Sequence, residues 1–245
     1  DSGIAFPQLV YLGDDLLFTS GPAMIELRNV CKTFVLNGHR NTVADDITVT
    51  FPHNTAVGIL GRNGAGKSTM LKMLAGTMEP DSGEILVRGT ISWPVGFAGS
   101  FHPDLTGLQS TRFIARVYGV ETDELCEFVH EFSELKEHFY LPVRSYSSGM
   151  KSRLAFGISM GIKFDTYLVD EVTAVGDASF KKKSEELFRA RMKDSSAVVV
   201  THALGQIERL CNHVAVLEDG CLHYFTDVMN GIEFHQEIMR KASPD

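Results

Sequence analysis

Short apolar runs alternate with stretches of helical spacing along this chain, which is the pattern of an α/β protein. Residues 56–60, 167–169, 197–200 and 214–217 are runs of this kind and read as buried strands. Residues 67–74, directly after the first run, predict a short helix. Because α/β sheets bind ligands at the carboxyl ends of their strands, we look first at the polar residues that follow each run.

Further stretches place apolar residues at helical spacing. Residues 101–146 read as helical, residues near 228–239 predict a final helix, and Met150, Leu154 and Ile158 share one helix face. The periodicity of residues 101–146 would equally fit a plain packed pair of helices. Its apolar positions are Leu125, Phe128, Val129, Phe132 and Leu135.

The loop after the first strand fits the phosphate-binding pattern G-x-x-x-x-G-K-[S/T] over residues 61–68. Its glycines let the backbone turn tightly and aim N–H groups at phosphate oxygens, and the helix that follows adds the positive end of its dipole. Lys67 is expected to neutralise the β- and γ-phosphates of ATP, and Ser68 to hold Mg²⁺. The residues predicted to line this site are Gly61, Asn63, Gly64, Ala65, Gly66, Lys67, Ser68 and Thr69.

Two further strands end in residues suited to hydrolysis. Asp170 and Glu171 follow the run at 167–169, and we expect Asp170 to serve the metal and Glu171 to polarise the attacking water. His202 follows the run at 197–200. Acids at strand ends are often only solvated, and a lone histidine is more often structural or on the surface, so neither feature identifies a site by itself.

Residues 146–151 begin a helix with Ser-Ser-Gly, which is either an ordinary serine N-cap or a second anion site. Taken with the phosphate loop, the Asp-Glu pair and His202, in this order, the chain resembles the ATPase subunits of ABC transporters over residues 24–222. The resemblance implies that Ser147 and Gly149 contact the γ-phosphate held by a second, facing subunit of a homodimer, and that Lys67, Glu171 and His202 are catalytic.

The resemblance assigns two more residues. Asp177 falls at the D-loop aspartate, and Phe34 falls where an aromatic side chain stacks on adenine. The alternative for Phe34 is packing in the core of a first strand.

The fold that the resemblance implies is a P-loop NTPase core with a mostly parallel sheet, an N-terminal antiparallel β part and an inserted helical subdomain. A single ATPase domain is expected over residues 24–245, with residues 24–95 and 160–245 as the nucleotide-binding core and 96–159 as the helical subdomain. Residues 1–23 are expected to be a non-native extension, because residue 24 is a methionine that looks like a natural start; the alternative is a genuine extension that docks on the core.

The chain departs from the family pattern at two motifs. Its signature reads Tyr-Ser-Ser-Gly-Met over residues 146–150 in place of Leu-Ser-Gly-Gly-Gln. Residues 93–102 lack the glutamine that the family uses to sense the metal and to link to its membrane partner; His102 either substitutes for it or is a surface residue of a glycine-rich loop. These departures resemble the branch that exports capsular polysaccharide from bacteria.

Exporters of O-antigen or teichoic acid are the alternative within the family, but many of them carry a long C-terminal extension. Only one strand, a turn and a helix are expected after His202, which favours the capsule branch. The implied partner is a separate transmembrane permease, and the expected location is peripheral, at the cytoplasmic face of the bacterial inner membrane.

Composition narrows the other possibilities. The formal net charge is −8 without a basic stripe, which argues against nucleic acid as a partner. The run at residues 181–183 is expected to be the solvated face of a helix that buries Phe180, Leu187 and Phe188. Four scattered cysteines and dispersed histidines predict neither disulfides nor zinc, and the sequence lacks an apolar run long enough to span a membrane.

Two readings outside transport compete with this one. A soluble ABC ATPase acting on ribosomes or DNA would be expected to show a second ATPase module or long coiled coils, and neither is visible in this sequence. A P-loop kinase would leave His202 and the helix start at Ser147 without roles.

Overall fold

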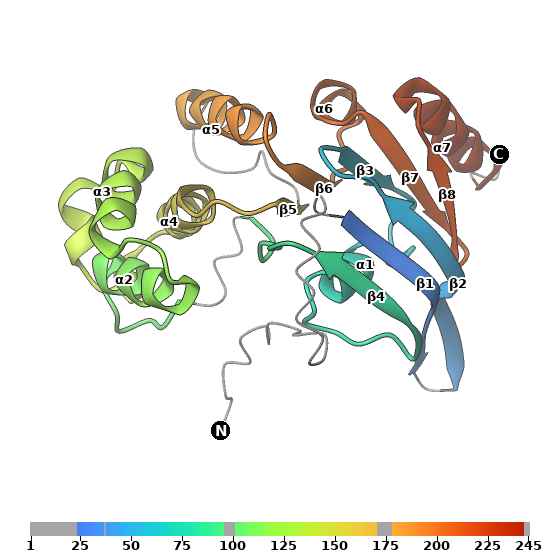
Figure 1. Cartoon of the computed structure of the whole chain (residues 1–245), viewed down its shortest axis with the longest axis horizontal. Coiled ribbons are helices and arrows are strands. Elements are labelled where there is room, and N and C mark those ends of the chain that lie inside the picture. Colours follow the sequence, from blue (N-terminus) through green and yellow to red (C-terminus); the bar gives the residue numbers. More distant parts are fainter. Residues whose placement is uncertain (1–23, 37, 96–100, 171–177, 243–245) are drawn as a thin grey trace. The chain divides into compact units, whose positions relative to one another are not determined.

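The computed structural model describes residues 24–36, 38–95, 101–170 and 178–242, and these fall into two units. The described parts of the first unit lie within Asp1–Ile91, Asp165–Glu171 and Asp194–Asp245, and those of the second within Ser92–Phe164 and Val172–Lys193. Each unit is built around its own set of elements, which Figure 1 labels.

Two sheets form the first unit in its described residues. An antiparallel sheet has the order β2-β1-β4, with β1 at Met24–Leu36, β2 at His39–Phe51 and β4 at Ser82–Arg88. The other sheet has the order β5-β6-β3-β7-β8 and is parallel from β5 to β7, whereas β8 runs antiparallel to β7. Its strands are β3 (Ala56–Leu60), β5 (Thr166–Asp170), β6 (Ser196–Val200), β7 (His213–Glu218) and β8 (Cys221–Phe225).

The α1 helix (Lys67–Leu74) joins the two sheets through one apolar core. Met70, Leu71 and Leu74 are almost fully buried and share a cluster with residues of β1, β2 and the parallel strands. The parallel strands are buried as continuous runs because both faces of their sheet are covered.

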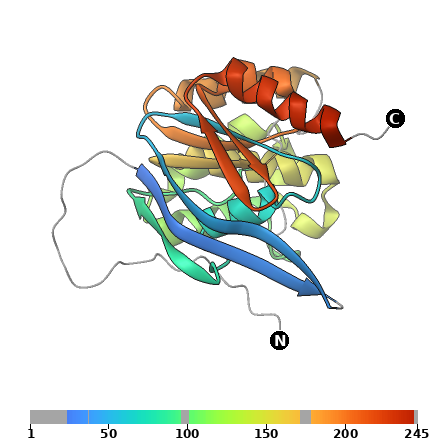
Figure 2. The same ribbon diagram turned by 90° about the vertical axis from the view of Figure 1, so that its right-hand side faces the viewer.

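Two helices cover the other face of the parallel sheet, α6 (Leu204–Leu210) and α7 (Val228–Ala242), and Figure 2 shows α7 across the sheet from β1 and β2. Close packing explains two glycines: a Cβ at Gly58 would lie 2.6 Å from Ile207 Cδ1, and one at Gly231 would lie 2.6 Å from Val214 Cβ. The α/β class, the parallel sheet and the antiparallel N-terminal part predicted from sequence are confirmed.

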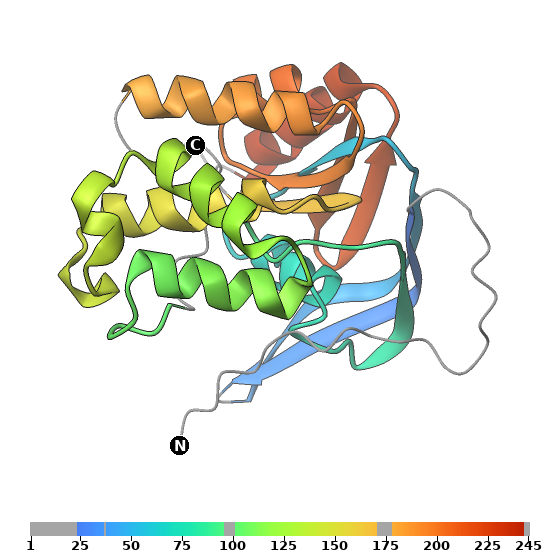
Figure 3. The same cartoon turned by 60° about the vertical axis from the view of Figure 1, so that its left-hand side comes forward.

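The second unit is helical, with α2 (Gly107–Tyr118), α3 (Thr122–Ser133), α4 (Ser148–Gly161) and α5 (Ala178–Arg191), and with short 3₁₀ turns η2 (Lys136–Tyr140) and η3 (Val143–Ser145) (Figure 3). The rings of Phe128, Phe156 and Phe180 each pack on Phe132. Thr106 begins α2 with a capping box closed by Gln109.

The expected solvated lysine run is confirmed only in part. Lys181 and Lys182 are exposed, whereas Lys183 is half-buried: its Nζ donates to Phe132 O at 3.1 Å and to Glu134 Oε1 at 2.8 Å, and it lies 4.9 Å from the centre of the Phe132 ring. Of the three side chains expected to be buried, Phe180 and Phe188 are buried and Leu187 is half-buried. A long lysine stem covers apolar surface while its charge finds acceptors, which a run of sequence does not reveal.

Candidate nucleotide site

The phosphate-binding loop occupies the turn from β3 to α1, and its glycines adopt conformations that other residues avoid. Gly64 has φ 83° and Gly66 has φ 103°, both in the left-handed region. A Cβ at Gly66 would lie 2.1 Å from Val43 Cγ1, so β2 presses directly on the loop. A Cβ at Gly64 would meet no atom within 4 Å, so backbone conformation alone demands glycine there.

Lys67 lies back over the loop that precedes it. Its Nζ donates to Gly61 O at 2.7 Å and to Arg62 O at 2.8 Å, and the residue is 7% exposed. Ser68, the next residue, is exposed at the first turn of α1. The helix begins at Gly66 without a side-chain cap, which leaves its first N–H groups for another acceptor.

The strand register brings the next predicted residues to the same edge of the parallel sheet. Asp170, the last residue of β5, pairs with Val200 of β6, and Val200 pairs with Ile59 of β3. The ends of β3, β5 and β6 are therefore aligned. The loop that starts at Gly61 and the residue His202 both follow strand ends that lie near Asp170. Both Asp170 and His202 are exposed. The carboxylate of Asp170 and the hydroxyl of Ser68 are oxygen donors of the kind that Mg²⁺ prefers.

A residue that the sequence reasoning missed also belongs to this edge. His235 lies on α7, and burial together with the positive charges of Lys67 and His202 lowers its pKa. Its Nδ1 is buried and lacks a hydrogen-bond partner in the described part of the chain. The sequence carries no signal for it, because the packing of α7 against the sheet brings it there.

Phe34 lies near the end of β1 and is 38% exposed, so it is not a core residue of its strand. It pairs with Asn41 of β2, two residues before the Val43 that contacts Gly66. Phe34 therefore lies on the same pair of strands that contacts the phosphate-binding loop.

The second predicted anion site is the start of α4. Ser147 is the N-cap, and its Oγ accepts a hydrogen bond from Met150 N at 3.2 Å. A Cβ at Gly149 would have only Ser147 Oγ nearby, at 4.0 Å, so packing among the described residues does not require a glycine there. Ser147 is exposed and Gly149 half-buried.

Two of the predicted site residues, Glu171 and Asp177, lie outside the described residues. His102 is exposed, and its Nδ1 accepts from Asp104 N at 3.3 Å in a local turn, as expected of a surface residue. Within the described ranges, neither a cluster of metal-ligating His, Cys, Asp and Glu side chains nor a helix long and apolar enough to cross a bilayer is found.

Comparison with known proteins adds the family. The model of the family described as ABC transporter matches residues 44–174. The polysialic acid transport ATP-binding protein KpsT of Escherichia coli is 46% identical over 86% of this chain and 95% of its own length. The capsule polysaccharide export ATP-binding protein CtrD of Neisseria meningitidis is 43% identical over 88% of this chain and all of its own length.

More distant relatives are named for the export of other polymers. ATP-binding proteins named for O-antigen and teichoic acid export match at 28% to 39% identity. A solved dimeric ATP-binding cassette, MJ0796 in a post-hydrolysis state with ADP and Pi, superimposes with a TM-score of 0.69 at 22% identity, over 82% of this chain and 97% of that one. This likeness supports the fold.

Proposed function

We propose that this chain, which belongs to the ABC transporter family of ATP-binding proteins, hydrolyses ATP to drive export of a capsular polysaccharide through a separate permease. The observation that carries the proposal is the near full-length similarity to two capsule exporter ATPases at 43% and 46% identity. O-antigen or teichoic acid export is less well supported, because relatives so named are less similar. A soluble ABC ATPase has no specific observation in its favour.

The β3–α1 loop is the proposed site of the ATP phosphates. Its backbone N–H groups and the start of α1 favour anions, and Lys67 brings a positive charge that is already fixed by two loop carbonyls. Ser68 and Asp170 are the proposed ligands of Mg²⁺, which would neutralise charge between the β- and γ-phosphates. Phe34 is the proposed partner of adenine.

Hydrolysis needs a base and a group that stabilises the γ-phosphate. Glu171, directly after Asp170, is the proposed base that takes a proton from the attacking water. His202 is the proposed donor to the γ-phosphate, and Asp177 is the proposed D-loop residue. These assignments rest on family resemblance and, for Glu171 and His202, on the position of β5 and β6 at one sheet edge.

Two copies of the chain are proposed to enclose each ATP. In this arrangement the start of α4 of one copy, with Ser147 and Gly149, meets the γ-phosphate held by the other. The exposure of Ser147 and the absence of a packing reason for Gly149 support a role outside their own chain.

The permease is the proposed membrane partner, and it would hold the ATPase at the cytoplasmic face of the bacterial inner membrane. The proposed organisation is one ATPase domain over residues 24–245, in which the helical subdomain at 96–159 meets the permease. Residues 93–102 lack the glutamine that the family uses to link to its membrane partner. His102 is the proposed replacement for it in the contact with the permease.

Export is tested in capsule-producing cells in which this chain is the only copy of its ATPase. Lys67→Ala removes the charge at the phosphates, and we expect polysaccharide to accumulate inside these cells while surface capsule disappears. Lys72→Ala, an exposed lysine on the same helix, is the matched control and should leave the capsule normal. Normal surface capsule in the Lys67→Ala cells would refute the proposed function.

A further inference from the structure

Lys32 lies on the same face of β1 as Phe34. Residues two apart on a strand point to the same side, and Lys32 Nζ lies 5.6 Å from the centre of the Phe34 ring. This separation is within the range of a cation–π contact. One side of the ring therefore faces a fixed positive charge.

The ammonium of Lys32 is held in place by the turn that leads into β4. It donates to Asp81 Oδ1 at 2.7 Å and to Glu79 O at 2.9 Å. The hydrogen bond from Lys32 is the main reason that the pKa of the Asp81 carboxyl is lowered. The side chain of Lys32 is only 15% exposed, although its partner Asp81 is half open to solvent.

The same carboxylate also fixes the strand between Lys32 and Phe34. Asp81 Oδ2 accepts from Thr33 N at 2.7 Å, and Asp81 N donates to Cys31 O at 2.8 Å. The backbone on both sides of Lys32 is thus tied to one residue. Phe34, just beyond this clamp, keeps a ring that is partly open to solvent.

We propose that Lys32 is the positioning residue for the adenine base: it occupies one face of Phe34 and leaves the other to stack on adenine. The inference rests on the proposed function, in which Phe34 is the adenine partner. Its physical basis is that a ring held before ligand binding loses less rotamer freedom when the base arrives. The attraction between the Lys32 ammonium and the negative face of the ring holds the ring in this orientation.

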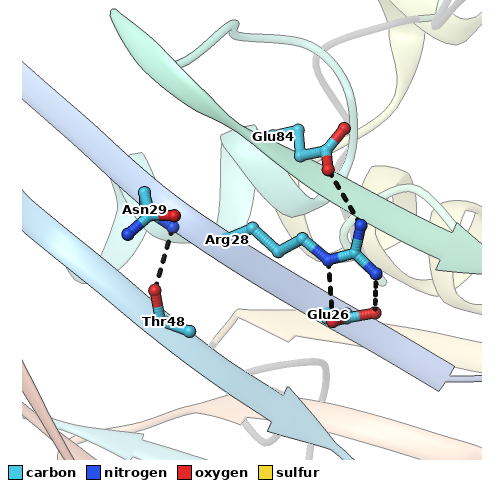
Figure 4. Close-up of polar contacts among 5 residues, drawn as sticks. All are labelled: Glu26, Arg28, Asn29, Thr48 and Glu84. Atoms are coloured by element: carbon cyan, nitrogen blue, oxygen red, sulfur yellow. Dashed lines mark hydrogen bonds and ion pairs between the residues drawn. The ribbon is translucent and has the colours of Figure 1, made fainter.

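An ordinary surface ion pair on the same strand supplies the matched control. Arg28 donates from Nε to Glu26 Oε1 at 2.8 Å and from Nη1 to Glu84 Oε1 at 3.0 Å, which ties β1 to β4 just as the Lys32 contacts do (Figure 4). Arg28→Met removes a cation and two ion pairs from β1 at a position well separated along the strand from Phe34. It should therefore leave nucleotide binding unchanged.

The test is a double-mutant cycle on the affinity for ATP, with Lys32→Met, Phe34→Ala and the double variant in the full chain. We expect Lys32→Met to raise the Kd for ATP by roughly three- to tenfold, because the Phe34 ring is then no longer held before binding and loses rotamer freedom when the base arrives. We expect the same substitution to add nothing once Phe34 is alanine. Lys32→Arg should keep the affinity within about twofold, and kcat at saturating ATP should stay near the wild-type value.

Inorganic tripolyphosphate, which lacks the base, separates an effect on adenine from one on phosphate charge. Its affinity should be equal in wild type and Lys32→Met. Three results would each overturn the role of Lys32 and leave the ATPase assignment intact. They are an equal loss of affinity for ATP and for tripolyphosphate in Lys32→Met, additive changes in Kd in the double variant, and an unchanged Kd for ATP in a folded Lys32→Met protein. If Phe34→Ala alone left ATP binding unchanged, the adenine contact itself would be refuted, and this inference with it.

If Lys32→Met failed to fold, Asp81→Asn would replace it. The amide keeps the size of the carboxylate and weakens the hold on Lys32. A rise in the Kd for ATP that depends on Phe34 would support the proposal, and an unchanged Kd would contradict it.

Discussion

Lys67 shows how a single side chain is prepared for a ligand before the ligand arrives. The residue is 7% exposed and its ammonium donates to two carbonyls of the loop, so its charge is already held at the backbone that is proposed to bind the phosphates. A buried charge needs such partners, because an unpaired ammonium is costly to desolvate. Gly66 contributes in a different way, since its φ of 103° and the contact with Val43 leave no room for a side chain.

Protonation of His235, on α7, should lower the free energy of unfolding. Its pKa is lowered from 6.5 by burial and by Lys67 and His202, so the folded chain holds its proton less firmly than the unfolded chain does. The resulting contribution to stability is full above the unfolded value of 6.5 and is lost as the pH falls through it toward the lower pKa of the folded state.

This predicts a pH-dependent difference in melting temperature. When the pH is lowered from about 7.5 to about 5.5, the melting temperature of His235→Gln should fall less than that of the wild-type protein. His53→Gln, which changes an exposed histidine, should follow the wild type. Thermal unfolding at several pH values measures all three, and a His235→Gln curve that tracks the wild type would contradict the assignment.

Among the elements, α4 carries a glycine, Gly149, that the proposed contact with a second chain would need and that the described packing of its own chain does not. Gly149 lies in the first turn, where an added Cβ makes no close contact. Alanine is the better helix former, by up to about 1 kcal/mol in a helix interior. Packing among the described residues therefore gives no reason for glycine at this position.

Gly149→Ala should for this reason keep or raise the melting temperature while ATP hydrolysis falls by at least about tenfold, because the new methyl group would crowd the facing phosphate. Ser152→Ala, one turn along the same helix, should change neither property. Calorimetry and a phosphate-release assay give the two readouts. A Gly149→Ala protein that is stable and hydrolyses ATP at the normal rate would remove the signature helix from the site.

The elements also show why some of the structure was readable from sequence. The strands β3, β5, β6 and β7 are buried on both faces and appear as plain apolar runs, and α1 begins at the lysine of its motif. In contrast, β4 and β8 contain mostly exposed or half-buried positions, so their sequences lack a strong period.

The residues of the candidate site that belong to local sequence motifs could be predicted from the sequence. Asp170 ends its strand, the phosphate-binding loop and His202 follow theirs, and the register brings those strands together. His235 and the role of Lys183 depend on tertiary packing, which no local pattern encodes. The same is true of Lys32, whose contact with Phe34 depends on a turn from a distant strand.

At the scale of the whole molecule, the proposed function requires two chains acting together. The P-loop and the start of α4 are each proposed to form part of a phosphate site, the first in one copy and the second in its partner. ATP should then hold the two copies together for as long as hydrolysis is prevented, because the bound triphosphate contributes to both surfaces.

Glu171→Gln is the variant that tests this claim most directly, since it keeps the shape of the side chain and removes the base. Hydrolysis should fall by about 10²–10⁴-fold while Mg-ATP still binds through Lys67 and Asp170. The measurement is the molar mass of this variant by size exclusion with light scattering, with and without ATP. The account predicts a dimer only with ATP, and a monomer when Lys67→Ala is added; a variant that is inactive yet stays monomeric with ATP bound would contradict it.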